Sequence, residues 1–573
     1  MQQLLTAFWL IIISPSVLAD VLGCADKTPG EKQLLWGDLH VHTAHSMDAW
    51  AFGATATPQE AYAFAKGQPL RLANGELKQI DRPLDFAAVT DHPETWDQMY
   101  TCTDPEYADN AHCNELREFR RERNSARIFY DYLIPMVTRQ PPVLPDFCDD
   151  SGNCEIARKN QWHRAQRAAN EANEPCEFSA LIGYEWTASP GGQHWHRNVI
   201  FRSAAVTPQA YDYVRFPEVH SLWQQLDENC IEDKGCRVLT IPHNINWADG
   251  GPTFAVETET DQQWARRNKF ERLAEIFQEK GASECLPEFA EDLDEDCDFN
   301  LAQVNAARAR LSGATSASPA EAWKQARSSY YRTLLGRGLL AYQTGSDRSN
   351  PLMLGAIGST DTHFGTPGRV AEGDYTRGIS TMFLTDEQQL RAVDFNPGGL
   401  VAVWAEQNTR ASVFDALYRR EAYGTSGPRI KLKFGVAEQG ACEAEDLGLR
   451  VSMGGTYRAQ RGAVPWFAVL VGKDETPIAE VQIIKGAIQN GELKEVVVTI
   501  AAFEPARSEE CVMWKDVNFD PEAPTYWYAR VLETKTPRWS KRLCERAELC
   551  DEYPKADQMV AERAWSSPIW FLP

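Results

Sequence analysis

Two histidines in the first apolar segment of the chain have the spacing of metal ligands. His40 and His42 alternate with Leu39 and Val41, and the stretch begins with the apolar residues 34–35. Residues i and i+2 of a strand point to the same face, so both imidazoles can reach one metal ion. An H-x-H pattern is short, however, and two histidines hydrogen-bonded at a strand end would also explain it.

Four further apolar segments end in residues of the same kind. The segments 83–90, 178–184, 237–242 and 352–358 are predicted strands, and their ends carry Asp91 and His92, Glu185, His243, and Asp361 and His363. Sheets in α/β proteins place their chemistry at the carboxyl ends of strands. Buried charge without a partner is costly, so packing alone does not explain five such endings. Imidazoles and carboxylates suit zinc, manganese or iron, and a carboxylate such as Glu185 can bridge two ions.

Helical segments and loops separate these strands, which predicts an α/β fold. Helices are predicted at 58–66, 114–132, 155–173, 220–229, 319–336 and 412–421. A hairpin return is expected at 194–201, a further core strand at 273–277, and closing strands at 378–384 and 400–404. The polar stretches of about 93–177 and 278–350 are interpreted as insertions in this core.

The pattern of apolar and polar residues changes after residue 430. Short alternating runs occur at 430–434, 449–453, 466–471, 478–484, 495–501 and 526–532. Strands that are separated by turns without helices are typical of a β-sandwich. Residues 431–573 are therefore predicted to form a small all-β domain.

The length and charge of the chain restrict its class. A chain of 573 residues is too long for one compact core, which suggests two to four domains. The 58 basic and 81 acidic residues give a net charge of −23, which argues against nucleic acid or an anionic membrane as the main partner. A small phosphorylated substrate is compatible with this negative charge, because bound metal ions can make the electrostatic potential at their site positive.

The N-terminus has the pattern of an export signal. Residues 4–19 form an apolar run that is short for a membrane span and ends in small residues before Asp20, which predicts a signal peptide at 1–19. Cys24 ends a sequence that resembles a lipoprotein processing site. An anchored lipoprotein is therefore an alternative to a protein free in the periplasm or secreted.

The cysteines favour an oxidising compartment. Of 14 cysteines, ten fall in close pairs: Cys102/Cys113, Cys148/Cys154, Cys230/Cys236, Cys285/Cys297 and Cys544/Cys550. Their neighbours are polar loop residues and no C-x-x-C pattern occurs, so disulfide bonds explain them better than zinc. The even total favours Cys24 as a bridged residue, because its lipidation would leave thirteen.

Together these motifs resemble the PHP (polymerase and histidinol phosphatase) superfamily, and most closely its branch known as domain of unknown function 3604. The phrases that carry the resemblance are G-D-L-H-V-H-T from Gly37, T-D-H from Thr90, G-Y-E-W-T from Gly183, H-R-N-V from His196, P-H-N from Pro242, S-T-D-T-H from Ser359 and T-R-x-S-V-F-D-A-L from Thr409. The resemblance covers about residues 34–430 and the ending 566–570. It implies a distorted (β/α)7 barrel over residues 20–430, with a trinuclear metal site at the carboxyl ends of its strands.

The resemblance also implies which residues hold each of two or three divalent ions (Mn, Zn or Fe). The first ion would use His40, His42, Glu185 and Asp361; the second would share Glu185 and add His196 and His243; the third would use Asp48, His92 and His363. Asp48 stands where the superfamily commonly has histidine, so the third ion is where this chain departs from the pattern. Asp91, and also Glu94, would orient an imidazole without binding metal.

The function implied by this resemblance is that of an exported phosphoesterase. A water bridging two ions would lose a proton and attack the phosphorus of a small anionic phosphate ester. Arg410 and Arg377 are candidates to bind the substrate anion, although either could form a structural salt bridge instead. Two alternatives are left open: a metallohydrolase acting on a non-phosphate ester or amide, and a secreted metal- or glycan-binding protein without catalysis.

Overall fold

The computed structural model describes most of the chain. Its described residues are 24, 31–103, 110–143, 153–249, 254–287, 297–301, 319–345, 348–375, 384–443, 447–459 and 463–573. Three predictions fall outside these ranges: the signal peptide at 1–19, the anion-binding role of Arg377, and nearly all of the strand at 378–384.

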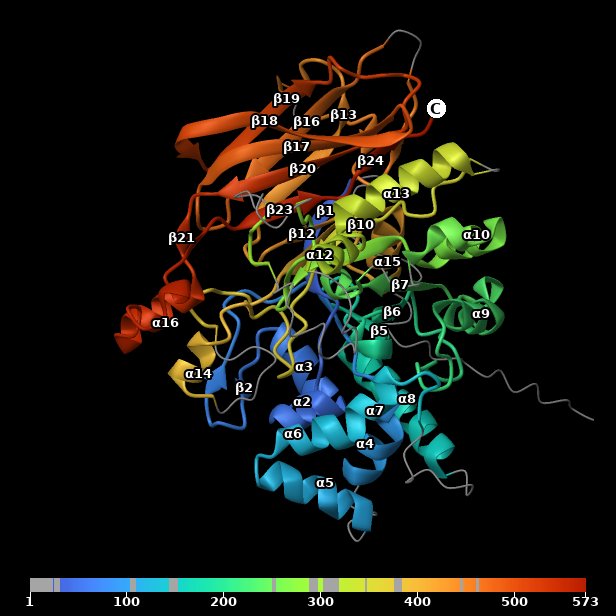
Figure 1. Ribbon diagram of the computed structural model, residues 1–573, viewed down its shortest axis with the longest axis vertical. Coiled ribbons are helices and arrows are strands. Elements are labelled where there is room, and N and C mark those ends of the chain that lie inside the picture. The colour runs from blue at the N-terminus through green and yellow to red at the C-terminus, as the bar shows by residue number, and fades with distance from the viewer. Residues whose placement is uncertain are drawn as a thin grey trace, which may run out of the picture.

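A mixed sheet of 13 strands runs through the molecule (Figure 1). Its order is β15 (Thr456–Tyr457), β24 (Ile569–Phe571), β20 (Thr525–Glu533), β23 (Arg563–Ser566), β12 (Ala422–Thr425), β11 (Leu400–Ala405), β1 (Gln33–Asp38), β4 (Phe86–Val89), β5 (Ser179–Trp186), β6 (Arg197–Phe201) and β7 (Val238–Pro242), with β17 (Ile478–Gln489) on β20 and β18 (Glu492–Arg507) on β17. Strands β1, β4 and β5 are parallel to one another, and β6 returns antiparallel beside β5. The strands predicted at 83–90, 178–184, 237–242 and 400–404 and the hairpin return at 194–201 are therefore present.

A second sheet completes the surroundings of the core. It contains β10 (Gly355–Gly358), β8 (Leu273–Gln278) and β9 (Gly281–Ala282), with β8 parallel to β10. Strand β8 lies beside β7, and β10 lies beside β12. Alternate residues from both sheets join one buried cluster, which includes Leu35, Phe86, Ala88, Leu181, Ile200, Leu239, Leu273, Ile357 and Val401. The chain is thus a mixed α/β protein with a large mixed sheet, while the (β/α)7 barrel stays a prediction.

Helices surround this strand layer. They include α3 (Pro58–Ala65), α8 (Asn153–Ala172), α9 (Val219–Asn229), α10 (Asp261–Phe270) and α15 (Arg410–Arg419). Helix α3 begins where the sequence predicts it: Thr57 and Glu60 form a capping box and Pro58 takes the first helical position. Helix α8, from the first predicted insertion, packs on α3 and β5.

Short helices from the loop after β1 and from the same insertion form one end of the molecule (Figure 1). They are α2 (Met47–Phe52), α4 (Trp96–Thr103), α5 (Ala111–Arg121), α6 (Ser125–Arg127), the π-helix η3 (Ile128–Leu133) and α7 (Ile134–Thr138). Their inner faces share a separate hydrophobic cluster that contains Trp50, Met99 and Leu116. The insertion and α2 therefore share a small core.

The single helix predicted at 319–336 is broken in two. Helix α12 (Pro319–Arg327) ends before Tyr330, whose backbone is extended, and α13 (Tyr331–Thr344) follows. The backbone N–H groups of Tyr331 and Arg332 donate to the carbonyls of Ser283 and Glu284 at 2.9 and 3.0 Å. These tertiary hydrogen bonds replace the helical ones, which local sequence cannot predict.

The C-terminal region consists mainly of strands, as predicted. A four-stranded sheet has the order β14 (Val451–Ser452), β13 (Lys431–Ala437), β16 (Trp466–Gly472) and β19 (Glu509–Lys515). Strands β15, β17, β18, β20, β23 and β24 belong to the large sheet, because β23 pairs with β12. Among the described strands, β21 (Thr536–Pro537) and β22 (Met559–Val560) pair only with each other. The region also contains α16 (Trp539–Ala547), which the sequence analysis did not predict and which lies beside α14 (Asp386–Leu390) (Figure 1). The domain boundary near residue 430 stays a prediction.

Disulfide bonds tie several of these segments. Among the described residues they are Cys24–Cys176, Cys102–Cys113, Cys230–Cys236, Cys285–Cys297, Cys442–Cys511 and Cys544–Cys550. Cys154 is also disulfide-bonded, and Cys148 lies outside the described residues. Such bonds indicate folding outside the cytoplasm. Because Cys24 is bridged, its thiol cannot also carry a lipid, which removes the support for the lipoprotein alternative.

Within the part of the chain that the structure describes, no helix combines the length and the apolar character needed to span a membrane.

Candidate metal centre

The predicted ligands meet at one edge of the parallel strands. His40, His92 and His243 follow the ends of β1, β4 and β7, and the loop after β10 carries Asp361 and His363. Glu185 lies near the end of β5. Because β6 runs antiparallel to β5, the residue before β6, His196, lies beside Glu185. Strand topology therefore brings together residues that are far apart in the sequence.

Four ligand atoms converge where the first ion was predicted. Nε2 of His40 lies 3.1 Å from Oε2 of Glu185 and 3.1 Å from Oδ1 of Asp361. Nε2 of His42 lies 3.1 and 3.2 Å from the same two oxygens. All four side chains are buried. Bond lengths of about 2.0–2.2 Å place neighbouring ligand atoms about 2.8–3.6 Å apart in tetrahedral or octahedral coordination. The four separations fit that range.

Two further groups surround this one. The other oxygen of Glu185, Oε1, lies 2.8 Å from Nδ1 of His196 and 3.0 Å from Nε2 of His243. Oδ2 of Asp48 lies 3.0 Å from Nε2 of His92 and 3.3 Å from Nε2 of His363. Glu185 thus directs one oxygen at each of two groups, which is the geometry of a bridging carboxylate. The nine residues in these three groups are called the ligand cluster below.

Some inward-facing atoms of the ligand cluster lack a hydrogen bond. Nε2 of His42 and Oδ1 of Asp361 are fully buried and face each other, yet among the described residues neither makes a hydrogen bond. Buried polar atoms normally have partners, because leaving them unpaired is costly. A divalent ion would satisfy both atoms, so the donor set fits a metal.

Hydrogen bonds on the outer side fix the orientation of His42. The hydroxyl of Ser46 donates to Oδ1 of Asp91 at 2.7 Å, so its oxygen accepts from Nδ1–H of His42 at 3.0 Å. Nε2 of His42 therefore presents a lone pair to the centre. Asp91 also accepts two hydrogen bonds from Thr43. Asp91 thus lies behind the imidazole of His42, and its role in orienting a metal ligand stays a prediction.

Other histidines are held in the same way. Nδ1 of His40 lies 3.0 Å from Oε1 of Glu275, and Nδ1 of His363 donates to the carbonyl of Asp361 at 2.8 Å. Nε2 of His196 lies 2.7 Å from the hydroxyl of Ser189. Each of these imidazoles keeps its other nitrogen toward the cluster, where an ion would bind it.

His92 is supported through a chain of two residues. Its Nδ1 lies 2.5 Å from Oγ1 of Thr187. Oε1 of Glu94 in turn accepts from the backbone N–H of Thr187 at 2.9 Å and of Tyr213 at 3.0 Å. Glu94 therefore acts on His92 through Thr187 and does not contact the imidazole directly.

Sequence reasoning missed three ionisable residues on or after β8. Glu275 contacts His40, Oε1 of Glu279 lies 3.4 Å from Nδ1 of His363, and Nζ of Lys280 contacts Oδ2 of Asp361. The predicted strand at 273–277 contains Glu275, and Glu279 and Lys280 follow it as polar residues follow the other strands. The pattern of an apolar strand followed by polar residues was therefore present here too, but residues from 278 onward were assigned to an insertion.

Strong electrostatic coupling accompanies this geometry. Burial lowers the pKa of His40, but the carboxylates of Asp361 and Glu275 outweigh burial and raise this pKa well above its usual value. Burial raises the pKa of Glu185, while neighbouring histidines lower it well below its usual value. Neighbouring carboxylates likewise outweigh burial and raise the pKa values of His92 and His363, so protons on these histidines and on His40 balance the buried carboxylates. A bound cation would replace these protons, so ion binding would release them.

Arg410 is not brought into the ligand cluster. Its guanidinium donates to the carbonyls of Ala180 and Ala169 and to Oδ1 of Asn170, at 2.5–2.7 Å. Ala180 precedes Glu185 on β5 by five residues, so the two lie roughly 16 Å apart along the strand. Arg410 thus ties α15 to α8 and β5, while Arg377 lies outside the described residues.

Comparisons with known proteins identify a family but no activity. The chain matches the family described as "Protein of unknown function (DUF3604)" over residues 29–510 and 504–573. No curated protein and no solved structure matches the chain.

Proposed function

We propose that this chain, which belongs to the DUF3604 family, is an exported metal-dependent phosphoesterase. The observation that carries the proposal is the convergence of four buried ligand atoms, from His40, His42, Glu185 and Asp361, at 3.1–3.2 Å. The proposed substrate is a small phosphate ester, hydrolysed at a site of two or three Mn, Zn or Fe ions. Export to the periplasm or the medium agrees with the disulfide bonds.

The proposal includes a link to the PHP superfamily and its (β/α)7 barrel. The phrases G-D-L-H-V-H-T, T-D-H, P-H-N and S-T-D-T-H support the link. The buried cluster that joins alternate residues of β1, β4, β5, β6, β7, β8, β10 and β11 supports a ring of strands around one core. Barrel enzymes carry their active sites at the carboxyl ends of such strands.

The residues of the cluster have distinct tasks in the proposed reaction. Divalent ions, when bound, would neutralise a phosphoryl group and lower the pKa of a water molecule. Glu185 would hold two ions side by side, since its two oxygens face different histidine pairs. Ser46 and Glu275 keep the imidazoles of His42 and His40 turned inward. Orientation of this kind fixes the geometry before substrate arrives.

Lys280 adds a cation at the edge of the cluster. It is buried, and its ammonium contacts Oδ2 of Asp361 while Oδ1 faces His40 and His42. This contact holds the Asp361 carboxylate in one orientation. An ammonium here would also favour the approach of an anionic substrate, as lysines do in other phosphate sites.

Metal analysis and a hydrolysis assay test the proposal together. Protein purified without added metal is analysed for bound elements, and turnover of an aryl phosphate is measured with Mn²⁺ or Zn²⁺ before and after chelation. We expect the double variant His40→Ala/His42→Ala to lose both bound metal and turnover. His163→Ala, which removes an exposed histidine on α8, should keep both.

A substrate panel separates the proposal from its nearest alternative. Phosphate esters, carboxyl esters and amides are compared under the same metal conditions, because an activated water can also attack a carbonyl carbon. Turnover of carboxyl esters or amides alone would favour a non-phosphate metallohydrolase. Wild-type protein that binds metal but turns over no substrate of the panel would contradict the proposed phosphoesterase.

A further inference from the structure

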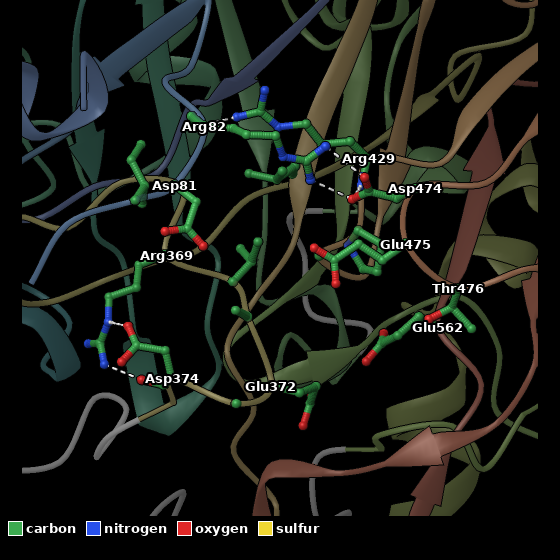
Figure 2. Close-up of a pocket in the computed structure, with 18 of the residues that line it drawn as sticks. Asp81, Arg82, Arg369, Glu372, Asp374, Arg429, Asp474, Glu475, Thr476 and Glu562 are labelled. Atoms are coloured by element: carbon green, nitrogen blue, oxygen red, sulfur yellow. Dashed lines mark hydrogen bonds and ion pairs between the residues drawn. The ribbon is translucent and has the colours of Figure 1, made fainter.

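A cavity of about 550 Å³ is lined by residues from both the N-terminal and the C-terminal parts of the chain, and none of its lining residues belongs to the ligand cluster. Residues 77–82 line one side of it, and residues 368–374 of the loop after His363 line another. The C-terminal region contributes residues 474–476, Glu533 and Glu562. Its volume is within the range of small-molecule sites. Figure 2 shows that many charged side chains surround it.

Most positive charges of the cavity wall are already engaged. The guanidinium of Arg82 binds both oxygens of Asp474 at 2.6 Å, and Arg369 binds Asp374 at 2.6 Å, as the dashed lines in Figure 2 mark. Nη2 of Arg429 donates to the backbone carbonyls of residues 82 and 83. Arg82 and Arg369 are thus neutralised by the two aspartates, and Arg429 is held by backbone carbonyls.

In the described part of the chain, three glutamates that line the cavity are not paired with a lysine or arginine in this way. Among the described residues, Glu372, Glu533 and Glu562 form no salt bridge with any lysine or arginine. Glu562 accepts from the hydroxyl of Ser426, and Glu372 accepts from a backbone N–H. Glu533 is 2 % exposed, and its Oε1 has no hydrogen-bond partner in the described structure. Buried polar atoms normally have partners, so this oxygen is open to a hydrogen bond from a ligand.

The strand ladder forces two of these glutamates together. Leu532 of β20 pairs with Arg563 of β23, and the N–H of Glu533 donates to the carbonyl of Glu562 at 2.9 Å. Like charges placed opposite each other on neighbouring strands are destabilising. Burial raises the pKa of Glu533 to about 8, and burial together with Glu372 raises the pKa of Glu562 well above its usual value. A bound cation would relieve this repulsion.

We propose that the cavity binds a small organic cation whose ammonium group donates hydrogen bonds to Glu533 and Glu562. Apolar side chains of Leu77, Ile80 and Val370 also line the cavity and would contact its carbon chain. A single metal ion fits less well, because the described residues of this cavity contain no group of three compactly placed ligand atoms. The site is separate from the ligand cluster, so this inference does not depend on the proposed reaction.

The experiment uses 1,4-diaminobutane as the probe in calorimetric titration of the whole protein. We expect saturable binding to the wild type. Affinity should fall about tenfold to hundredfold in Glu533→Gln and in Glu562→Gln, because each replaces a charged hydrogen-bond acceptor with a neutral one. Asp81→Asn, which removes an exposed carboxylate from the same cavity, should bind within about twofold of the wild type. The neutral analogue 1,4-butanediol should give no saturable heat.

Three results would overturn the proposal. In the first, the wild type shows no saturable binding of the diamine, and in the second, the wild type and both glutamine variants bind it with equal affinity. In the third case, the protein binds Ca²⁺ in a way that depends on these glutamates but does not bind the diamine. Circular dichroism checks that each variant is folded. If Glu533→Gln does not fold, Glu562→Gln decides, because a glutamine there can still accept the hydrogen bond from Ser426.

Discussion

At the scale of residues, the direction of one hydroxyl group determines how the imidazole of a predicted ligand is oriented. Ser46 has a single O–H, and this group points to Asp91. Its oxygen must therefore accept from His42, which leaves the inner nitrogen of that imidazole free for an ion. Ser46 also accepts from the backbone N–H of His92 at 3.2 Å. One small side chain thus positions two of the predicted ligands.

Replacing Ser46 tests this arrangement. Ser46→Ala leaves Nδ1 of His42 without an acceptor, so the imidazole can rotate or change tautomer. We expect metal affinity to fall about tenfold to hundredfold, as is typical for lost supporting hydrogen bonds at metal sites. Competition with a chromophoric chelator measures the affinity. Ser221→Ala, at an exposed helix start, is the control, and equal affinities in the two variants would contradict the role given to Ser46.

Lys280 offers a second prediction at this scale. Lys280→Met removes the ammonium that contacts Asp361, and breaking a buried ion pair typically costs about 3–5 kcal/mol. Bound ions would neutralise Asp361 in its place. We therefore expect a drop in Tm that is large with a chelator and smaller with saturating Mn²⁺.

The matched control is Lys159→Met, because Lys159 forms an exposed pair with Glu155 on α8. Exposed pairs contribute little, so its Tm should hardly change under either condition. A drop for Lys280→Met that is the same with and without metal would show that Lys280 acts independently of the ions.

At the scale of elements, strand endings were the part of the site that the sequence predicted well. Apolar runs followed by histidine or carboxylate identified the ends of β1, β4, β5, β7 and β10. Glu279 and Lys280 were missed because the residues from 278 onward were interpreted as an insertion. Ser46 and Ser189 were missed for another reason: which hydroxyl faces an imidazole depends on backbone geometry, and periodicity carries no information about it.

The close approach of β12 to β10 leads to a prediction on these elements. A Cβ on Gly424 would lie 2.6 Å from backbone atoms of Gly358 and Ile357. Gly424→Ala must push β10 away, and β10 carries the loop with Asp361 and His363. We expect a loss of roughly 1–3 kcal/mol in stability, typical of overpacking, together with lower metal content.

Gly373→Ala is the control, because a Cβ there meets nothing within 4 Å. Thermal denaturation and elemental analysis of both variants provide the measurement. Unchanged metal content in a folded Gly424→Ala protein would mean that the position of β10 tolerates the shift.

The paired strands β20 and β23 give a prediction on pH. Burial raises the folded-state pKa of Glu533 to about 8, with repulsion from Asp474 next, while Lys473 lowers it. The unfolded chain ionises this carboxyl at about pH 4.5. Stability is therefore lost as pH rises from about 4.5 through about 8. Glu533→Gln cannot ionise, so its stability relative to the wild type should increase over this window by up to a few kcal/mol.

Denaturant unfolding of both proteins at acidic, neutral and alkaline pH, with a chelator present, checks this expectation. The acidic measurement is the internal control, because Glu533 is protonated there in both states. Parallel pH curves for the two proteins would mean that Glu533 ionises at the same pH in the folded and unfolded chain, which would contradict the raised pKa.

At the scale of the whole molecule, the sequence indicated how much strand the C-terminal region contains but not what it pairs with. Alternation predicts a strand and its buried face, whereas the partner strand depends on contacts distant in sequence. In the structure β23 pairs with both β12 and β20, so the last strands extend the sheet that carries the ligand cluster. The helix α16 escaped prediction because its polar residues give only a short apolar stripe against α14.

The Cys24–Cys176 disulfide supplies a prediction for the molecule as a whole. It closes a separation of 152 residues and lies near Gln407, whose side chain accepts from the N–H of Cys24. The chain-entropy model gives such a long loop about 5 kcal/mol of stabilisation as an upper value. Cys176 precedes β5, whereas Glu185 lies near the opposite end of that strand, roughly 20 Å or more away.

The double variant Cys24→Ser/Cys176→Ser should therefore have a lower Tm but unchanged metal content per folded molecule. Thermal denaturation and elemental analysis of the folded fraction measure the two effects separately. Loss of metal together with stability would mean that the disulfide end and the ligand cluster unfold as one unit.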